Sequence, residues 1–323
     1  MKLETKQKSK PIKIGRLMTA RAKYNFQLYS LCILPILWII LFCYVPMFGV
    51  VIAFKNYKFN KGILGSDWVG FKNFEFFLKS NDLFVVTRNT LLLNTLFIVT
   101  SVVGAVLLAV LLYNVRSRRK TKVLQTVYIT PNFVSWVTVA YVVYAILNPQ
   151  FGILNSILKF FGLAPIDWYS ESKYWPWILT IVNLWKNVGM DAIVYYAALM
   201  GIDDTLIEAA KIDGASGAQT LFRVIIPSVM PSITICTFLS LTNGFKLFDQ
   251  NLALTGGQPF IIQPDGSAIK TTEMLALNIY STFYGQGASA PGYAQAKAVI
   301  FFILVAALGL LQLSFTRKRE VQQ

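Results

Sequence analysis

Residues 205–227 read TLIEAAKIDGASGAQTLFRVIIP, a polar segment of helix-forming residues that lies between two apolar stretches. Thr205 and Glu208 have the spacing of a capping box, in which a hydroxyl and a carboxylate satisfy the first backbone amides of a helix. Gly214 stands where that helix should end, because glycine readily adopts the left-handed conformation of a helix C-cap. A second candidate box begins at Ser216. The segment therefore predicts a helix, a turn and a second helix that continues into the following apolar stretch.

The composition indicates a membrane protein. The chain has 323 residues, of which 55% are hydrophobic and 14% charged, and its mean hydropathy is +0.54. A soluble domain has no place to bury so much apolar surface, whereas a bilayer does. A spanning helix needs about 20 mostly apolar residues. Six segments meet that requirement: 28–54, 85–113, 123–147, 176–200, 224–243 and 295–316. We therefore expect an all-α integral membrane protein with six transmembrane helices.

The distribution of positive charge predicts the orientation. The net charge is +15, and 18 Lys and Arg residues fall in the 66 residues of segments 1–27, 114–122, 201–223 and 317–323. The alternate segments, 55–84, 148–175 and 244–294, hold 9 in 109 residues. Because cytoplasmic segments carry an excess of Lys and Arg, both termini and segment 201–223 are predicted to be cytoplasmic. Basic and aromatic residues are not interleaved as in nucleic-acid-binding surfaces, so no nucleic-acid partner is expected.

The sequence carries few groups that could perform chemistry. It contains no histidine, which is the commonest general base and metal ligand. Its three cysteines, Cys32, Cys43 and Cys236, all fall in apolar spans, where a free cysteine acts as a small hydrophobic residue. No Walker loop of the form Gly, four residues, Gly-Lys-Ser/Thr occurs. The chain is therefore not expected to be an enzyme, and any ATP that drives it must be bound by another chain.

The polar segment resembles the EAA loop of type I ABC importer permeases. Glu208-Ala209-Ala210 is followed by three residues, Gly214, nine residues and then Val224-Ile-Ile-Pro227. The family pattern has the same spacing and ends in Ile, any residue, Leu and Pro, so Val224 and Ile226 are mild departures. The resemblance covers roughly residues 85–316. Further stretches resemble permeases for complex sugars: Trp68-Val-Gly-Phe-Lys-Asn-Phe74, Trp185-Lys-Asn-Val-Gly189 and Ile212-Asp-Gly-Ala215.

The resemblance implies a type I ABC importer permease fold and a division of the chain. Residues 1–27 would form a basic cytoplasmic arm, 28–54 the first transmembrane helix and 317–323 a cytoplasmic tail. Residues 85–316 would form the transmembrane domain, with a docking loop at 203–227 that sits in a cleft of an ATPase subunit. The residues implied to dock on the ATPase are Glu208, Ala209, Ala210, Asp213, Gly214 and Pro227.

The resemblance also implies the partners. They are a second homologous permease, two ATP-binding subunits forming a homodimer or heterodimer, an extracytoplasmic solute-binding protein, membrane lipid and an oligosaccharide. ATP and Mg would be bound by the ATPase, so this chain would hold no cofactor and no metal. The expected location is the bacterial cytoplasmic membrane, as a multi-pass protein.

The fourth apolar segment carries a polar stripe. Asn183, Asn187 and Asp191 are spaced at i, i+4 and i+8 and share one helical face, with Trp185 and Lys186 beside them. A charged side chain in mid-membrane costs about 2.5–3.5 kcal/mol on insertion scales, so it indicates a functional site by default. Two interpretations stay open: these five residues line the path of the sugar, or they bind helix to helix within the permease pair.

Other functions remain as alternatives. Asp249, Gln250 and Asn251 are weaker candidates for the sugar path, because ordinary loop polarity explains them equally well. An ABC importer of peptides or of another non-sugar solute would use the same loop. A gradient-driven secondary transporter would require the match at 205–227 to be fortuitous. A membrane-anchored scaffold would leave the two charges of the fourth span without a purpose.

Overall fold

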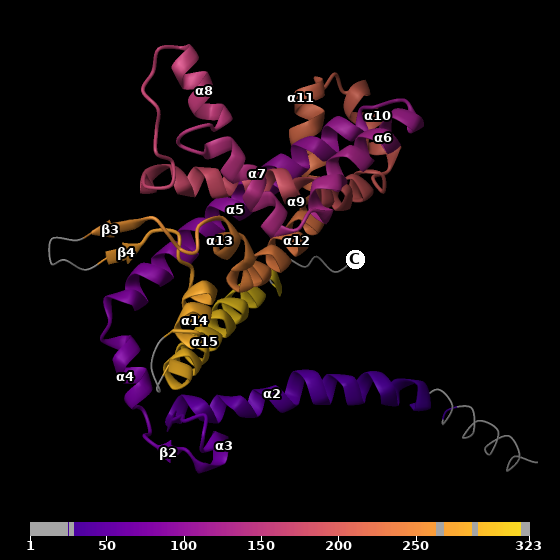
Figure 1. Cartoon of the computed structure of the whole chain (residues 1–323). Coiled ribbons are helices and arrows are strands. Elements are labelled where there is room, and N and C mark those ends of the chain that lie inside the picture. Colours follow the sequence, from indigo (N-terminus) through magenta and orange to yellow (C-terminus); the bar gives the residue numbers. More distant parts are fainter. Residues whose placement is uncertain (1–24, 26–28, 263–267, 286–289, 318–323) are drawn as a thin grey trace, which may run out of the picture.

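The computed structural model describes residue 25 and residues 29–262, 268–285 and 290–317 (Figure 1). The arm at 1–27 and the tail at 317–323 therefore lie almost wholly outside the described residues, and the cytoplasmic location of both termini stays a prediction. The described part is mostly helical, with two short antiparallel pairs of strands. The predicted all-α class of fold is confirmed.

Four of the described helices are long and apolar enough to cross a membrane: Tyr29–Phe54, Leu83–Tyr113, Gly217–Lys246 and Ala290–Leu311. A fifth is the bent pair Arg118–Phe133 and Trp136–Leu147, if the pair is one span. The predicted fourth span is helix α9, Trp175–Leu199, which has the length of a span but is more polar because of its stripe. The number of six spans therefore stays a prediction.

The first span lies apart from the other helices and joins them only at its end (Figure 1). It includes η1 (Ile40–Tyr44), α2 (Val45–Met47) and η2 (Phe48–Phe54). Asn73 on α4 (Lys72–Leu78) donates hydrogen bonds to the backbone oxygens of Ala53 and Lys55, at 2.8 and 3.0 Å. Between the first span and α4 lie β1 (Lys55–Asn56), α3 (Gly62–Gly65) and β2 (Asp67–Trp68), and β1 pairs with β2. This junction fixes where the first span leaves the main bundle.

The centre of the bundle is the pair α5 (Asn81–Tyr113) and α9, which pack side by side over much of their length. Small residues make this close approach possible: Ala105, Ala109 and Ala192 are fully buried. Gly189 on α9 lies against the backbone of α6, where an added Cβ would come within 1.9 Å of the Tyr128 carbonyl oxygen. Close helix contacts through small residues are typical of membrane bundles.

The predicted third span is sharply broken. It consists of α6 (Arg118–Ile129), η3 (Thr130–Phe133) and α7 (Trp136–Leu147), and its two halves are bent by 94°. Ser135 caps the second half, because its hydroxyl accepts a hydrogen bond from the Thr138 amide at 3.2 Å. Residues 123–147 therefore do not form the single straight helix that an apolar run of this length suggests.

The remaining elements follow in chain order. α8 (Ile153–Phe160) and η4 (Ser172–Tyr174) follow α7, and α10 (Asp204–Ile212), α11 (Gly217–Thr220) and η5 (Leu221–Ile225) follow α9. The long α12 (Ile226–Lys246) leads to α13 (Asp249–Leu254), the β3–β4 hairpin (Phe260–Ile262 and Ala268–Lys270), α14 (Leu275–Phe283) and α15 (Ala290–Arg317).

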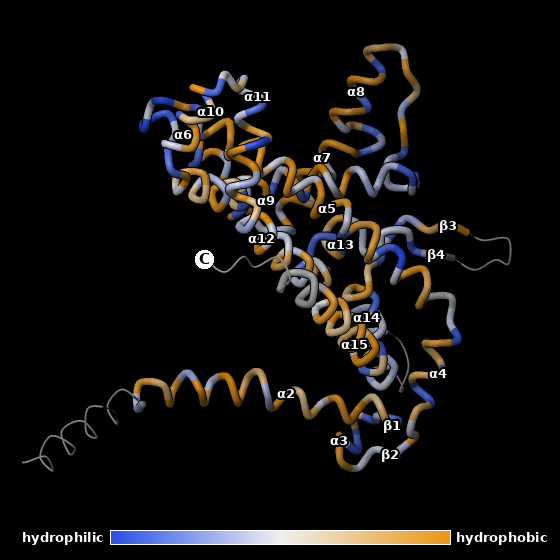
Figure 2. Tube along the Cα trace, turned by 180° about the vertical axis from the view of Figure 1, so that it is seen from behind, coloured by the Kyte–Doolittle hydropathy of each residue, from blue (hydrophilic) through white to orange (hydrophobic). Residues whose placement is uncertain are grey.

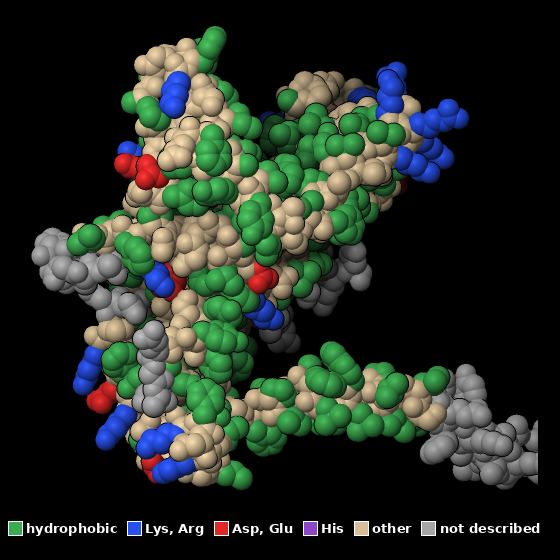
Figure 3. Space-filling model, in the orientation of Figure 1, with side chains coloured by type: hydrophobic (Ala, Val, Ile, Leu, Met, Phe, Trp, Pro, Cys, Tyr) green, Lys and Arg blue, Asp and Glu red, His purple; other side chains and the backbone are tan. Residues whose placement is uncertain are grey.

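The two ends of the bundle differ in charge. α6, α10 and α11 gather at one end, and β3, β4, α4 and α8 lie away from it (Figures 1 and 2). A cluster of Lys and Arg covers the first end (Figure 3), where the loop before α6 and its first turns carry Arg116, Arg118, Arg119, Lys120 and Lys122. The basic loop and the predicted docking loop thus lie together, as the charge distribution predicts for cytoplasmic segments.

Candidate functional site

The first helix of the predicted docking segment begins two residues earlier than the sequence suggests. The N-cap of α10 is Asp203, whose carboxylate accepts a hydrogen bond from the Thr205 amide at 3.0 Å. The predicted box of Thr205 and Glu208 is therefore wrong, because the neighbouring aspartate takes the capping position. This hydrogen bond lowers the pKa of Asp203 below its usual value, and the carboxylate stands where the helix dipole favours negative charge.

The turn after α10 has the predicted form. Gly214 adopts a left-handed φ of +77°, and the Ala215 amide donates to the Ala210 carbonyl at 2.9 Å, as in a Schellman motif. The second capping box is confirmed as well. The Gln219 amide donates to the Ser216 hydroxyl at 3.3 Å, and the Ser216 amide donates to the Gln219 side chain at 2.7 Å.

The residues implied to dock are accessible on this helix and turn. Glu208, Ala209, Asp213 and Gly214 are exposed and Ala210 is half-buried, whereas Pro227 is exposed in the first turn of α12. Glu208 also borders a cavity of about 350 Å³ between α10, α11 and the end of α5. The structure thus groups five of the six residues on α10 and the turn that follows it. Their role in docking stays a prediction.

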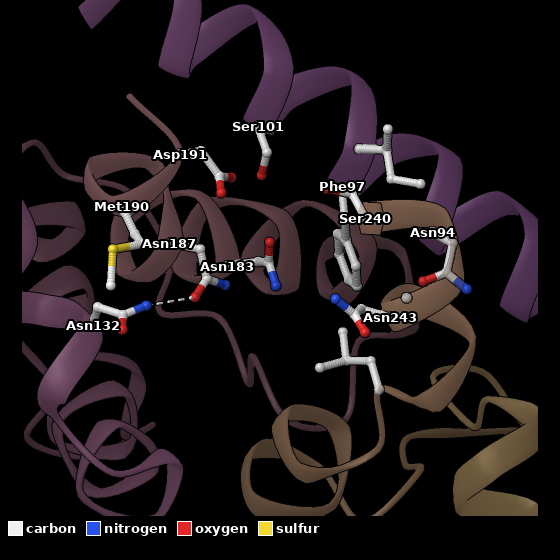
Figure 4. Close-up of a pocket in the computed structure, with 13 residues that line it drawn as sticks. Asn94, Phe97, Ser101, Asn132, Asn183, Asn187, Met190, Asp191, Ser240 and Asn243 are labelled. Atoms are coloured by element: carbon white, nitrogen blue, oxygen red, sulfur yellow. Dashed lines mark hydrogen bonds between the residues drawn. The ribbon is translucent and has the colours of Figure 1, made fainter. Parts of the chain in front are cut away.

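A second cavity lies inside the bundle and gathers most of the polar stripe (Figure 4). It has a volume of about 280 Å³ and is lined from α9 by Asn183, Asn187 and Asp191. Small-molecule sites typically have volumes of about 300–1,000 Å³, so this cavity is slightly smaller than that range. Three of the five residues predicted for the sugar path therefore share one cavity.

Two of the five predicted residues do not line it. Trp185 is half exposed on another face of α9. Lys186 is buried, and its ammonium group donates hydrogen bonds to three backbone oxygens at the break of the third span: Pro131 at 3.3 Å, Asn132 at 2.7 Å and Val134 at 2.5 Å. Its ammonium also lies 5.2 Å from the centre of the Trp136 ring. Lys186 therefore holds the broken helix together within this chain.

The other polar residues of the cavity were not predicted from the sequence. Asn94 and Ser101 lie on α5, Asn132 on η3, and Ser240 and Asn243 on α12. Asn94 and Ser101 are seven residues apart on α5, and Ser240 and Asn243 are three apart on α12, so each pair shares one helical face. This spacing of polar side chains inside apolar spans is the signal that could have found them.

Hydrogen bonds hold part of the lining in place. Asn132 donates to the Asn187 side chain at 3.2 Å, which is the dashed line in Figure 4. Asn183 donates to Gln250 at 2.8 Å, and Gln250 in turn donates to the Leu179 carbonyl at 2.7 Å. Gln250 is fully buried. This weaker candidate therefore acts behind the cavity wall, where it orients Asn183.

Asn94 is the exception among these amides. Its side chain is 2% exposed, yet neither its oxygen nor its nitrogen has a hydrogen-bond partner among the described residues. Gly244 faces it so closely that an added Cβ would lie 2.7 Å from the Asn94 side-chain oxygen. A buried polar group without a partner is costly, by about 1–3 kcal/mol. Asn94 is therefore a free donor and acceptor at the wall of the cavity.

Comparison with known proteins gives the family. Residues 101–321 match the family described as "Binding-protein-dependent transport system inner membrane component". The chain is similar to YteP of Bacillus subtilis (strain 168), a polygalacturonan/rhamnogalacturonan transport system permease protein, with 33% identity over 68% of each chain. It is also similar to AmyD of Thermoanaerobacterium thermosulfurigenes, a probable starch degradation products transport system permease protein, with 31% identity over 94% of this chain and 100% of AmyD.

Solved structures agree. One chain of a bacterial ABC transporter that imports the acidic polysaccharide alginate superposes with a TM-score of 0.80 at 27% identity, over 94% of this chain and 99% of that one. A chain of the same kind of transporter, in complex with an alginate pentasaccharide-bound periplasmic protein, gives 0.79 at 28% identity, over 93% of this chain and 96% of that one. The fold, the family match and the apolar helices lead to one conclusion. The chain belongs to the family of binding-protein-dependent transport system inner membrane components and is a multi-pass membrane protein of the ABC permease fold.

Proposed function

We propose that this chain is one of two permease subunits of an ATP-driven ABC importer that moves an oligosaccharide or other complex sugar across a bacterial cytoplasmic membrane. The observation that carries the proposal is the cavity between α5, η3, α9 and α12, whose lining is rich in side-chain amides. An amide both donates and accepts hydrogen bonds, as sugar hydroxyls do. Asn94 also lines this cavity, and its buried amide has no hydrogen-bond partner among the described residues.

The connection between the docking segment and the cavity supports a mechanism of alternating access. Gly217–Lys246 is one continuous helical stretch, so α11 and η5 lead directly into the α12 residues Ser240 and Asn243 of the cavity. On the other side, only four residues separate the end of α9, which carries Asn183, Asn187 and Asp191, from the start of α10. Movement of α10 would therefore shift two walls of the cavity.

In this proposal the energy comes from other chains. Two ATP-binding subunits, which hold ATP and Mg, dock at α10 and the Gly214 turn, and their closure moves the docking segment. A second homologous permease completes the pore. An extracytoplasmic solute-binding protein delivers the sugar to the opposite end. A periplasmic protein with a bound pentasaccharide in the similar alginate transporter supports that partner. This chain itself hydrolyses no ATP.

The relatives favour sugar over other solutes. Both YteP and AmyD carry carbohydrates in their names, and so does the "Multiple sugar-binding transport system permease protein MsmF" of Streptococcus mutans, at 30% identity over 94% of this chain. Peptide import remains the second candidate among ABC importers. Gradient-driven transport has no support from the family match.

Two substitutions in the docking segment test the proposal. Glu208→Lys places a cation on the exposed face of α10, and Gly214→Pro removes the left-handed turn. Both variants should insert into the membrane but lose ATP-dependent sugar uptake in cells. Asp167→Lys, a charge reversal at an exposed aspartate that makes no ion pair with any described residue, in the segment between α8 and α9, is the matched control and should transport normally. Unchanged uptake in both docking variants would remove the basis for a docking role.

A further inference from the structure

We propose that Asp191 makes the cavity select neutral oligosaccharides over those that contain uronic acids. This inference rests on the proposed function, because it concerns the sugar that enters the same cavity. Both kinds of sugar occur in the names of the relatives: polygalacturonan and alginate are acidic, whereas starch degradation products are neutral. Family membership alone therefore does not decide the charge of the cargo.

The first step is the charge of the lining. Among the described residues, Asp191 is the one charged side chain that lines the cavity, and the polar remainder consists of amides and hydroxyls. Figure 4 shows the Asp191 carboxylate and the Ser101 hydroxyl turned toward the side where Asn183 and Asn187 lie. This chain's share of the path therefore carries one negative charge.

The second step is that no cation in the described part of the chain neutralises it. The ion pairs found there all lie elsewhere, and Asp191 makes none. Lys186 is the other charged residue of α9, but its ammonium is held by backbone oxygens at the helix break. Lys246, at the end of α12, is exposed and does not line the cavity.

The third step is the interaction with a sugar. A carboxylate accepts hydrogen bonds from sugar hydroxyls. Because these hydroxyls are neutral, they bring no second charge into the cavity. A uronate carboxylate in the same cavity would be a second negative charge, and like charges at short range repel strongly where little water screens them. The surrounding asparagines are neutral, so they cannot cancel both charges. The arrangement therefore admits a neutral sugar and disfavours an acidic one, which is how sites discriminate between similar ligands.

The test uses matched sugars that differ only at C6, where one member of each pair carries carboxylates. The complete importer is purified in nanodiscs, and binding is measured without the solute-binding protein, whose own selectivity would otherwise mask that of the cavity. The probes are maltotriose and α-1,4-galactotriose, each compared with its counterpart in which the C6 hydroxymethyl groups are oxidised to carboxylates. The dissociation constant of each neutral trisaccharide should be at least about tenfold lower than that of its oxidised partner, a ratio that corresponds to about 1.4 kcal/mol.

Three substitutions assign the effect to Asp191. Asp191→Asn removes the charge at nearly constant shape. The dissociation constant of the oxidised sugar divided by that of the neutral sugar should fall by about tenfold, because the oxidised sugar binds more tightly. Asp191→Glu keeps the charge and should keep the discrimination, which separates charge from packing. Asp167→Asn, at an exposed aspartate in the segment between α8 and α9, is the matched control and should leave the ratio unchanged.

The outcomes separate the two proposals. Equal binding of neutral and oxidised sugars by the wild type, or an unchanged ratio in Asp191→Asn, would overturn the selectivity and leave the sugar-import function standing. Absence of any sugar binding and of any sugar uptake by the intact importer would overturn the proposed function, and the selectivity with it. Gel filtration of each variant complex confirms that the loss of discrimination is not a loss of assembly.

Discussion

The side-chain ammonium of Lys186 lies 2.7 Å from the backbone oxygen of Asn132, at the point where the third span is bent by 94°. A broken helix leaves backbone oxygens without their usual partners, and inside a membrane bundle water is not available to satisfy them. Lys186 donates to the oxygens of Asn132 and Val134, and also to the Pro131 oxygen, which accepts a further hydrogen bond from the Val134 amide at 3.2 Å. A charge within a span here stabilises an irregular backbone that forms part of the cavity wall.

Replacing Lys186 should therefore destabilise the complex. Lys186→Met keeps the length of the side chain but removes every donor, and hydrogen bonds to charged groups each contribute about 1.5–3 kcal/mol. We expect a clear fall in the midpoint of thermal unfolding of the purified importer in detergent. Lys159→Met on the exposed surface of α8 is the control. An unfolding midpoint for Lys186→Met equal to that of the control would contradict this role.

A single methyl group at Gly189 should disrupt the contact between α6 and α9. The Cβ of Gly189→Ala would lie 1.9 Å from the Tyr128 carbonyl oxygen, so one helix must move. Overpacking of this kind typically costs about 1–3 kcal/mol. The yield of assembled importer and its unfolding midpoint are the measurements. Gly309→Ala on α15 makes the same change where no atom lies within 4 Å, and should have no effect. Equal yields and equal unfolding midpoints for the two variants would show that α6 and α9 do not approach each other this closely.

Gln250 should influence sugar binding without touching the sugar. It holds the Asn183 amide at 2.8 Å from behind the cavity wall. Gln250→Leu removes that contact and leaves the buried amide of Asn183 unpaired, at a cost of about 1–3 kcal/mol. We expect the KM of sugar uptake to rise about fivefold or more, while the complex still assembles. Gln150→Leu, at an exposed position after α7, should leave KM unchanged. A KM that does not move in Gln250→Leu would show that the orientation of Asn183 is unimportant.

The Gly214 turn can be tested by a pair of alanine substitutions. Gly214→Ala forces a side chain into the left-handed region, which costs about 1–2 kcal/mol per residue. Gly217→Ala, three residues later, introduces the same methyl group where no positive φ and no close atom oppose it. Transport per ATP hydrolysed should fall in the first variant and stay normal in the second. A matched decrease in both would point to the methyl group itself rather than to the turn.

The sequence predicts local features well and distant contacts poorly. The end of α10 at Gly214 and the Ser216 capping box depend on neighbouring residues, and both are confirmed. The start of α10 was wrong by two residues because Asp203 and Thr205 are both good caps and only the geometry decides between them. The break of the third span has a local signal in Pro131, which the predicted span at 123–147 passes over, whereas Lys186, which stabilises the break, lies more than fifty residues further along the chain.

In the cavity, too, residues on one helix can be grouped from the sequence, whereas residues on separate helices cannot. Asn183, Asn187 and Asp191 share a face of one helix, so their periodicity predicts that they lie together, and they do. Asn94 and Asn243 reach the same cavity from helices that are far apart in sequence. Only the packing of α5 and α12 against α9 brings them there.

The most direct test of the account is sugar uptake by proteoliposomes that contain this chain, its companion permease and the ATPase, with ATP as the only energy source and the solute-binding protein present. The account predicts sugar accumulation that requires ATP hydrolysis and is lost in Asn187→Trp, which fills the cavity. Accumulation that proceeds without ATP under an imposed ion gradient, or that persists in Asn187→Trp, would contradict it.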